Sequence, residues 1–438
     1  MARETRAIAL LINADWKRMS LRRVIILVSL AALGALAIAG YLAGTAPREL
    51  VQTPTRYLDN GFPHDEIPEE HKSATAALLY ATDRLPINGD FTAERSNALI
   101  FGTVEVALGQ DATWEELVDA SQTSDRTRPW ELEMTDFREL GRFRDTPLPF
   151  TLEDGQPVDL PWPRAVYGFG ERSFQRMLSN RLATSAQKEV IIYVHGFNNS
   201  FVDSAKNLAE IWHFTGRWGV PLLYTWPAGR GGLLGYLTDR ESGEFTVFHL
   251  KETLRLVAVM PEVERVHVLA HSRGTDVVTS ALRELIISTR ASGQDPREAL
   301  KIRNLILAAP DLDYAVVGQR LIAERFIPAF ERISVYTSEG DGALGLSMWL
   351  MEGQRFGRLQ AGGLSMDEER IFENIRNVGF INVPETQTVI GHSYYRDSPE
   401  ALSDIIAMIR DDAEPGSPER PLTHLGGSFW EIPVQPER

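Results

Sequence analysis

Apolar residues between positions 189 and 410 follow two alternating patterns. Short continuous apolar runs recur, and we expect each to be a buried strand; they are residues 190–194, 221–226, 266–269, 305–309, 333–337 and 378–383. Segments with helical spacing lie between or after these runs, at residues 202–212, 252–260, 275–287 and 399–410. Apolar strands that alternate with helices predict an α/β fold with a mostly parallel, doubly wound sheet covered on both faces.

The first half of the chain has a weaker pattern. Leu99 to Leu108 is predicted to be a strand, and Trp130, Leu132 and Met134 alternate with acidic residues as on a half-exposed strand. Ser73 to Arg84 has helical spacing among scattered prolines. From Asp145 to Pro163 the chain is rich in turn residues, so we expect loops there.

The stretch from Val24 to Ala43 is twenty residues without a charge, long enough to cross a bilayer as a helix. Four basic residues lie just before it, which by the positive-inside rule keeps the N-terminus cytoplasmic and the bulk of the chain across the membrane; they are Lys17, Arg18, Arg22 and Arg23. A cleaved signal peptide and a buried core helix are the alternatives. The run is long for a signal peptide, and Pro47 follows the only well-placed small-residue site.

These patterns predict five parts. They are a cytoplasmic tail (1–23), one transmembrane helix (24–43), a membrane-proximal linker with one packed helix (44–95), the α/β domain (96–412) and a Pro/Gly-rich C-terminal tail (413–438) in which Phe429 and Trp430 can dock. In a double-membraned bacterium this corresponds to a single-pass inner-membrane protein with its main domain in the periplasm.

Composition and charge exclude several classes of function. The net charge is -15, with +4 on residues 1–23 and -19 on the remainder, which argues against nucleic acid as a partner. The chain has no cysteine, so disulfides, thiolate metal sites and a cysteine nucleophile are excluded. We find no metal-ligand spacing and no phosphate-cradling glycine loop, and we expect neither metal nor cofactor.

One serine lies on a sharp turn between a predicted strand and a predicted helix. The turn is Ala270-His271-Ser272-Arg273-Gly274, which fits the G-x-S-x-G nucleophile elbow except that Ala270 replaces the first glycine. Such a turn lifts the serine hydroxyl clear of the sheet, at the positive end of the next helix. The alternative is a serine that only caps that helix.

Ser272, Asp341 and His392 each follow a predicted strand, in that order along the chain. Function collects at the carboxyl ends of strands in a doubly wound sheet, so we expect the three side chains to meet. A serine hydroxyl needs an imidazole to take its proton, and the imidazole needs a carboxylate to fix its tautomer. Asp311, after an earlier strand, is the rival acid.

An acyl-transfer site also needs amide donors for the developing oxyanion. We expect one to be the N–H of Arg273, the residue after the nucleophile. The other is assigned to Phe197, with Asn198 as the rival, in the loop that follows Val194.

Other polar residues near this site are assigned structural roles. We expect His195 to buttress the oxyanion loop and His271 to pack beside the nucleophile without a catalytic role. Asp239, Arg240 and Glu241 are expected to form a loop ion network, with substrate binding as the alternative.

Several longer motifs from about Leu99 to Ser393 support a resemblance to a known family. The segments are Tyr193 to Phe201 (YVHGFNNSF), Thr225 to Gly229 (TWPAG), Gly235 to Ser242 (GYLTDRES), Leu269 to Thr275 (LAHSRGT), Leu307 to Asp311 (LAAPD), Tyr336 to Leu344 (YTSEGDGAL) and Gly391 to Tyr394 (GHSY). In these segments the chain resembles a bacterial family of alpha/beta hydrolases of unknown function in the esterase/lipase superfamily. We expect it to be a membrane-anchored member of that family. The resemblance implies the alpha/beta-hydrolase fold and suggests Ser272, Asp341 and His392 as a catalytic triad.

The order of Ser272, Asp341 and His392 along the chain and the family resemblance together predict a membrane-anchored serine hydrolase. We expect it to cleave carboxylic esters, small or lipid, through an acyl-enzyme. Arg273 departs from the family, in which a methionine or another apolar residue is commoner, and it favours a substrate with a negative group. The alternatives are a catalytically silent envelope protein that keeps the fold as an interaction surface, and acyl transfer or peptide hydrolysis by the same triad.

Overall fold

The computed structural model describes residues 47–342, 344, 356–358, 375–384 and 391–433. The chain divides into two units, Met1–Arg48 and Glu49–Arg438, and the fold below is that of the second. The predicted cytoplasmic tail and the membrane helix from Val24 to Ala43 lie outside the described residues. Within the described ranges, every helix is too short or too polar to cross a bilayer.

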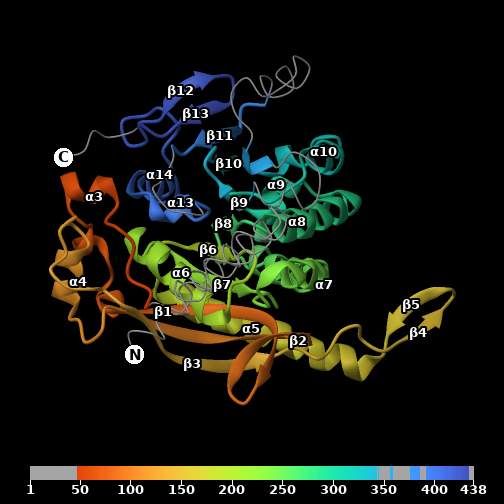
Figure 1. The fold of residues 1–438 in the computed structure, drawn as a ribbon. Helices are drawn as coiled ribbons and strands as arrows, with labels where there is room; N and C mark the ends of the chain where they lie inside the picture. Colours follow the sequence, from red (N-terminus) through yellow and green to blue (C-terminus); the bar gives the residue numbers. More distant parts are fainter. Residues whose placement is uncertain (1–46, 343, 345–355, 359–374, 385–390, 434–438) are drawn as a thin grey trace, which may run out of the picture. The chain divides into compact units, whose positions relative to one another are not determined.

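One large mixed sheet organises the described part of the chain (Figure 1). Its order is β12-β13-β11-β10-β9-β8-β6-β7-β1-β2-β3. Neighbours from β1 to β13 run parallel, and antiparallel pairs close both edges. The strands are β1 (Thr75–Ile87), β2 (Asp90–Leu108), β3 (Leu132–Arg142), β6 (Glu189–Val194), β7 (Val220–Thr225), β8 (Arg265–His271), β9 (Ile302–Ala308), β10 (Arg332–Thr337), β11 (Val378–Asn382), β12 (Thr423–Gly426) and β13 (Phe429–Glu431).

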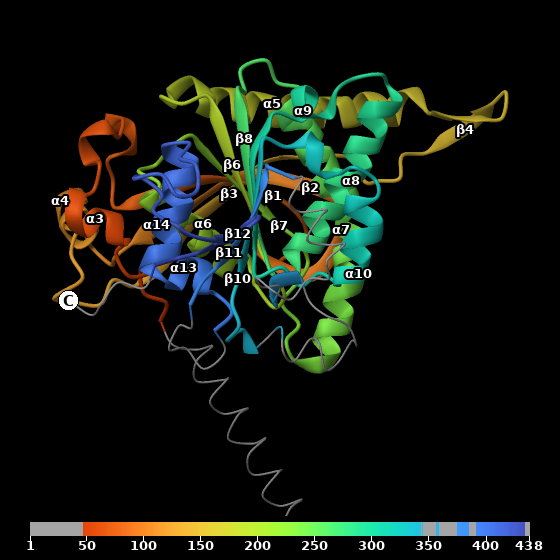
Figure 2. The ribbon, with the colours of Figure 1, turned by 90° about the horizontal axis from the view of Figure 1, so that it is seen from above.

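Helices cover the sheet on both faces (Figure 2). One face carries α5 (Pro161–Thr184), α7 (Gly232–Ala258), α8 (Gly274–Ala291), α9 (Pro296–Leu300) and α10 (Tyr314–Val317). The other carries α3 (Thr55–Asn60), α4 (Trp114–Ala120), α6 (Phe201–Phe214), α13 (Tyr394–Asp397) and α14 (Pro399–Arg410). Because successive side chains of a strand point to opposite faces, β6 supplies Val190 and Ile192 to one core and Ile191 and Tyr193 to the other. The predicted α/β fold is confirmed.

The sheet register brings the carboxyl ends of its central strands together. Val194 of β6 pairs with Ala270 of β8, and His271 pairs with Ala308 of β9. Farther along the sheet, Thr337 of β10 pairs with Asn382 of β11. The loops that follow these strands therefore emerge at one edge, although they are far apart in the sequence.

The segment from Ser73 to Arg84, predicted to be a helix in a linker, instead contributes most of strand β1, which begins at Thr75. Leu79 and Ala81 enter one core while Leu78 and Tyr80 enter the other, so the run alternates with a period of two. Strand β1 pairs with β7 and β2 on its two edges and has a hydrophobic core on each face, so an apolar residue suits every position of this run. The sheet domain thus begins well before residue 96.

Two helices, one of them entirely and the other in its first part, lie where the sequence did not predict a helix. The turn-rich stretch before Lys188 contains the hairpin of β4 (Phe150–Glu153) and β5 (Gln156–Asp159), which projects from the sheet in Figure 1, followed by the long helix α5. Pro161 is the first residue of α5, a position where proline costs no helical hydrogen bond. Helix α7 begins at Gly232, so the segment expected as a loop around Asp239 is helical.

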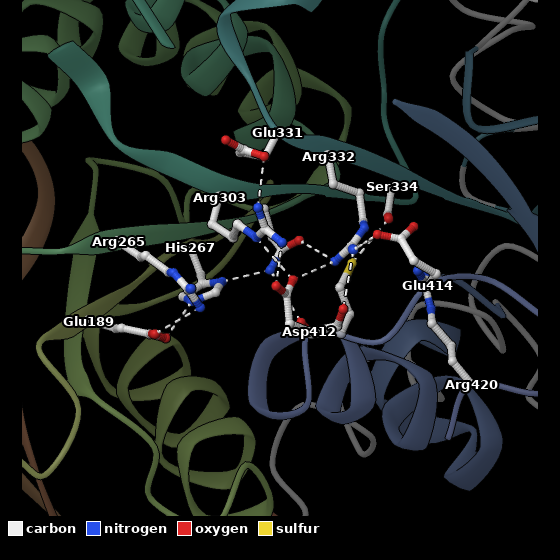
Figure 3. Close-up of polar contacts among 12 residues, drawn as sticks. Glu189, Arg265, His267, Arg303, Glu331, Arg332, Ser334, Asp412, Glu414 and Arg420 are labelled. Carbon is white, nitrogen blue, oxygen red and sulfur yellow. Dashed lines mark hydrogen bonds and ion pairs between the residues drawn. The ribbon is translucent and has the colours of Figure 1, made fainter. Parts of the chain in front are cut away.

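The predicted C-terminal tail is folded as well. Strand β13 pairs with β11, and the ring of Phe429 stacks on that of Phe380 with centroids 5.0 Å apart. A polar cluster at the amino ends of the strands leads into this segment (Figure 3). In it the Asp412 carboxylate accepts hydrogen bonds from Arg303 and Arg332, the latter only 7 % exposed. Phe429, which the sequence predicted to dock, therefore does so as part of a strand near the edge of the sheet.

Candidate active site

Ser272 lies between β8 and α8 with a left-handed backbone, φ 53°. A serine at positive φ is strained, and the neighbouring strand holds it there because the Ser272 N–H donates to the Ala308 carbonyl at 2.9 Å. A Cβ at Gly274 would lie 2.3 Å from the His195 carbonyl oxygen, so this position requires glycine. Ala270 is fully buried in β8, and the elbow forms with alanine at the first motif position.

The structure brings together the three side chains predicted to meet. His392 Nε2 lies 2.7 Å from Ser272 Oγ, and His392 Nδ1 lies 2.7 Å from Asp341 Oδ2. The imidazole is 17 % exposed, whereas the carboxylate is fully buried. The other oxygen of Asp341 accepts the Leu344 N–H at 2.9 Å, which fixes the orientation of the acid.

The rival acid, Asp311, has other contacts. It is buried, its Oδ2 accepts a hydrogen bond from the Tyr236 hydroxyl at 2.7 Å, and its backbone N–H donates to the Ser272 carbonyl at 3.4 Å. Because His392 Nδ1 contacts Asp341, that residue occupies the position of the acid partner.

His271 packs against the loop that carries His392. Its Nε2 donates to the His392 carbonyl at 3.1 Å, and its ring lies 4.9 Å from that of His392 and 4.8 Å from that of Tyr395. Burial, followed by the neighbouring His392, holds the pKa of His271 well below its usual value. A neutral His271 thus contacts His392 without adding charge beside it.

The loop after β6 lies directly against Ser272. A Cβ at Gly196 would lie 2.6 Å from Ser272 Cβ, so the backbone approaches closely only because this residue is glycine. The Asn198 N–H donates to Asp239 Oδ2 at 3.1 Å. Among the described residues, the N–H groups of Phe197 and Arg273 have no acceptor. The rival donor Asn198 is thus engaged, and the two assigned donors are free.

His195 supports this loop from inside. Its Nδ1 donates to the Gly196 carbonyl at 2.9 Å, its Nε2 accepts the Trp226 N–H at 3.0 Å, and its ring stacks on the Trp226 indole. Burial, with the nearby Arg84 as the second cause, holds the pKa of His195 well below its usual value. A neutral imidazole serves here as one donor and one acceptor, a structural role as predicted.

Two charged residues at this site differ from the sequence prediction. Asp239 belongs to helix α7 and binds backbone amides, whereas the sequence suggested a loop ion network. Arg84, which sequence reasoning assigned to the end of a helix, is 1 % exposed and contacts the same loop. The only feature of the sequence that could have pointed to Arg84 was its place as a charged residue at the end of an apolar run. The Arg273 side chain forms an ion pair with Asp276 at 2.9 Å.

Comparison of the sequence with known protein families identifies the family of this chain. A family described as alpha/beta hydrolase of unknown function (DUF900) matches residues 170–410, more than half of the chain. The chain belongs to this alpha/beta hydrolase family. Its matched region contains Ser272, Asp341 and His392, whereas β1, β2 and β3 precede it.

Solved structures of other hydrolases are similar to this alpha/beta hydrolase. A predicted CIB-like hydrolase from Thermoplasma acidophilum is 15 % identical, with 52 % of this chain and 89 % of that chain covered and a TM-score of 0.31. An esterase from Pyrobaculum calidifontis is 11 % identical, with 57 % and 93 % covered and a TM-score of 0.29. Comparison with curated proteins gives no match. Among the described residues, no group of three acidic or histidine side chains is placed to hold a metal ion.

Proposed function

We propose that this alpha/beta hydrolase is a serine hydrolase that cleaves carboxylic esters through an acyl-enzyme. The observation that carries the proposal is the continuous chain of contacts from Ser272 Oγ through His392 to Asp341. This arrangement can activate an alcohol oxygen at neutral pH, because the imidazole takes the proton and the buried carboxylate stabilises the imidazolium that forms.

The reaction proceeds in two steps. His392 Nε2 removes the Ser272 proton as Oγ attacks the ester carbonyl carbon, and the same proton then passes to the leaving alcohol as the C–O bond breaks. In the second step His392 removes a proton from water, the resulting hydroxide attacks the acyl carbon, and the acid leaves as Ser272 Oγ is protonated again.

The N–H groups of Arg273 and Phe197 are proposed to bind the oxyanion that forms in both steps. Their lack of an acceptor among the described residues, and the contact between the Gly196 backbone and Ser272, support this assignment. Each such donor contributes about 2.7–4 kcal/mol to the stabilisation of the transition state.

The substrate class is proposed to be a small-molecule or lipid carboxylic ester. The test is release of acid and alcohol from a panel of acyl esters of increasing chain length, with matching amides and with added alcohol as a competing acceptor. Ester cleavage that Ser272→Ala abolishes is the expected result. Cleavage of the amides alone, or complete transfer to the added alcohol, would instead assign peptide hydrolysis or acyl transfer. A folded protein inactive on every substrate would favour a silent interaction protein.

We also propose that Val24 to Ala43 anchors the protein in the inner membrane, with the N-terminus cytoplasmic and the hydrolase domain periplasmic. The uncharged run and the basic residues before it support this proposal. The full chain is expected to stay in the membrane fraction at alkaline pH, whereas a variant that begins at residue 47 is expected in the supernatant. Release of the full chain by alkali would contradict an anchor.

A further inference from the structure

Arg84 is a buried arginine at the carboxyl end of β1, before the region that matches the family. Its guanidinium enters the interior beside the loop that follows β6. Burying a guanidinium is costly unless its donors find acceptors, so the identity of those acceptors shows what the side chain does there.

Apart from the Thr92 carbonyl of β2, the acceptors of Arg84 belong to the loop after β6, the end of β7 and the loop after β7. Its Nη2 donates to the Asn199 carbonyl at 2.7 Å and lies 3.2 Å from His195 Nε2. Its Nη1 donates to the Ala228 carbonyl at 2.8 Å, and its Nε donates to Thr225 Oγ1 at 2.8 Å. One rigid guanidinium thereby joins the end of the oxyanion loop to the end of β7 and the loop after it.

Asp239 holds the same two loops by their amides. Its Oδ2 accepts the Asn198 N–H at 3.1 Å and the Gly229 N–H at 3.2 Å. Asn198 has a left-handed backbone, φ 54°, and its hydrogen bond to Asp239 helps to hold that conformation. Arg84 thus binds the Asn199 carbonyl and Asp239 binds the Asn198 N–H, within two residues of Phe197 on its C-terminal side.

Burial lowers the pKa of Arg84 to about 10, with Asp83 and Asp239 acting in the opposite direction. Burial raises the pKa of Asp239, and the backbone hydrogen bonds and Arg84 counteract that rise. Arg84 therefore stays charged at neutral pH, and its charged donors form stronger hydrogen bonds than neutral groups would.

We propose that Arg84 and Asp239 are positioning residues that hold the Phe197 N–H where the oxyanion forms. This inference rests on the proposed function. It means that β1, which lies outside the family-matched region, completes the active site through one side chain. Neither residue touches the reacting atoms, so loss of either is expected to displace the donor and to slow the chemical step more than substrate binding.

The experiment compares Arg84→Lys and Asp239→Ala with Arg217→Lys in the full chain. Arg217 is a matched control because it is 2 % exposed and donates to the Ser73 carbonyl at 2.6 Å and to the His71 carbonyl, far along the sheet from Ser272. The readouts are kcat and KM for a cleaved ester, the rate of fluorophosphonate labelling at Ser272, and the thermal unfolding midpoint.

For Arg84→Lys and Asp239→Ala we expect kcat and labelling rate to fall about 100-fold, with KM changed less than threefold. Arg217→Lys is expected to lower the unfolding midpoint comparably and to leave kcat within twofold. Equal kcat in all folded variants, or a loss that only tracks the unfolding midpoint, would overturn the inference. If the wild type itself neither labels nor cleaves esters, the proposed function fails instead. Should Arg84→Lys not fold, Asp239→Ala decides the question.

Discussion

Asp341 Oδ2 lies 2.7 Å from His392 Nδ1, although 51 positions separate the two residues along the chain. Their proximity is a property of the sheet. Strands β10 and β11 are parallel neighbours, and Thr337 pairs with Asn382 just before the segments that carry Asp341 and His392.

The first prediction separates this acid from its rival. In Asp341→Asn the backbone and packing are retained, but the amide cannot stabilise an imidazolium and favours the wrong tautomer of His392. We expect kcat for ester cleavage to fall by about 10⁴. Steady-state kinetics at saturating ester concentration provides the measurement.

Asp311→Asn is the matched control for that substitution. Asp311 contacts Tyr236 and is buried, so the variant is expected to lose some stability while kcat stays within about tenfold. A larger loss of kcat in Asp311→Asn than in Asp341→Asn would reverse the assignment of the acid.

The second prediction concerns the close approach of the oxyanion loop. Gly196→Ala would place a Cβ 2.6 Å from Ser272 Cβ and 3.0 Å from the His271 carbonyl oxygen, so the loop must move away from the nucleophile. Displacement of one oxyanion donor is expected to lower kcat by about 10²–10³.

Gly318→Ala serves as the comparison for Gly196→Ala. A Cβ at Gly318 would meet nothing within 4 Å. This variant should retain wild-type kinetics, and an equal loss in both variants would show that the Gly196 effect does not arise at the active site.

The third prediction is acid sensitivity from buried histidines. Burial is the largest cause that lowers the pKa of His71 (to about 4), His195, His213 and His271. Below a pH of about 6.5 the unfolded chain binds protons at these positions while the folded chain does not, so the free energy of unfolding falls as the pH falls. The expected loss is on the order of 1 kcal/mol per pH unit for each histidine between about pH 6 and pH 4.5.

The measurement is urea denaturation at a series of pH values. His213→Gln removes one of these groups at a site distant from Ser272, where His213 Nε2 contacts the Ser121 hydroxyl at 2.7 Å. The free energy of unfolding of His213→Gln is expected to fall less steeply as the pH falls. The difference in slope corresponds to about one proton fewer taken up on unfolding. An unchanged slope would mean that His213 is protonated in the folded protein.

The fourth prediction tests the cluster that precedes the C-terminal strands. Asp412→Asn tolerates the left-handed backbone at this position, φ 54°, but removes the charge that binds Arg303 and Arg332. We expect the free energy of unfolding to fall by roughly 1–2 kcal/mol, allowing for solvent screening at this partly exposed carboxylate.

Asp411→Asn is the control at the neighbouring position, where the carboxylate pairs with Arg56 in an exposed contact. A change below about 0.5 kcal/mol is expected. If the two substitutions cost the same, the Asp412 cluster has no special part in holding the C-terminal segment.

The sequence was sufficient to predict the central strands and the meeting of Ser272, Asp341 and His392. These strands are buried on both faces, which makes them continuous apolar runs, and the carboxyl ends of parallel strands share an edge. The elbow motif added the position of the nucleophile, since its spacing is set by a local backbone constraint.

Strand β1 and the C-terminal strands were predicted wrongly for a physical reason. The run from Ala76 to Ala81 is apolar in every position, and such a run does not distinguish a strand from a helix without knowledge of its neighbours. Strand β13 has three residues and depends on its pairing with β11, a contact that local sequence does not encode.

The positions of Arg84 and Asp239 also follow from tertiary structure alone. Arg84 is on β1 and Asp239 is on α7, and the atoms of the oxyanion loop to which they hydrogen-bond, the Asn199 carbonyl and the Asn198 N–H, are backbone atoms. Backbone atoms are the same at every residue, so no pattern of side chains could have paired these two residues with the oxyanion loop.

His392 and Asp341 are proposed to activate Ser272 as a nucleophile. Labelling with a fluorophosphonate, followed by mass spectrometry of the digested protein, tests this activation. We predict a single covalent adduct on Ser272, formed in the wild type and absent from Ser272→Ala, with a rate that falls steeply in His392→Gln. A folded wild-type protein that stays unlabelled, or that carries its adduct on another residue, would contradict the account.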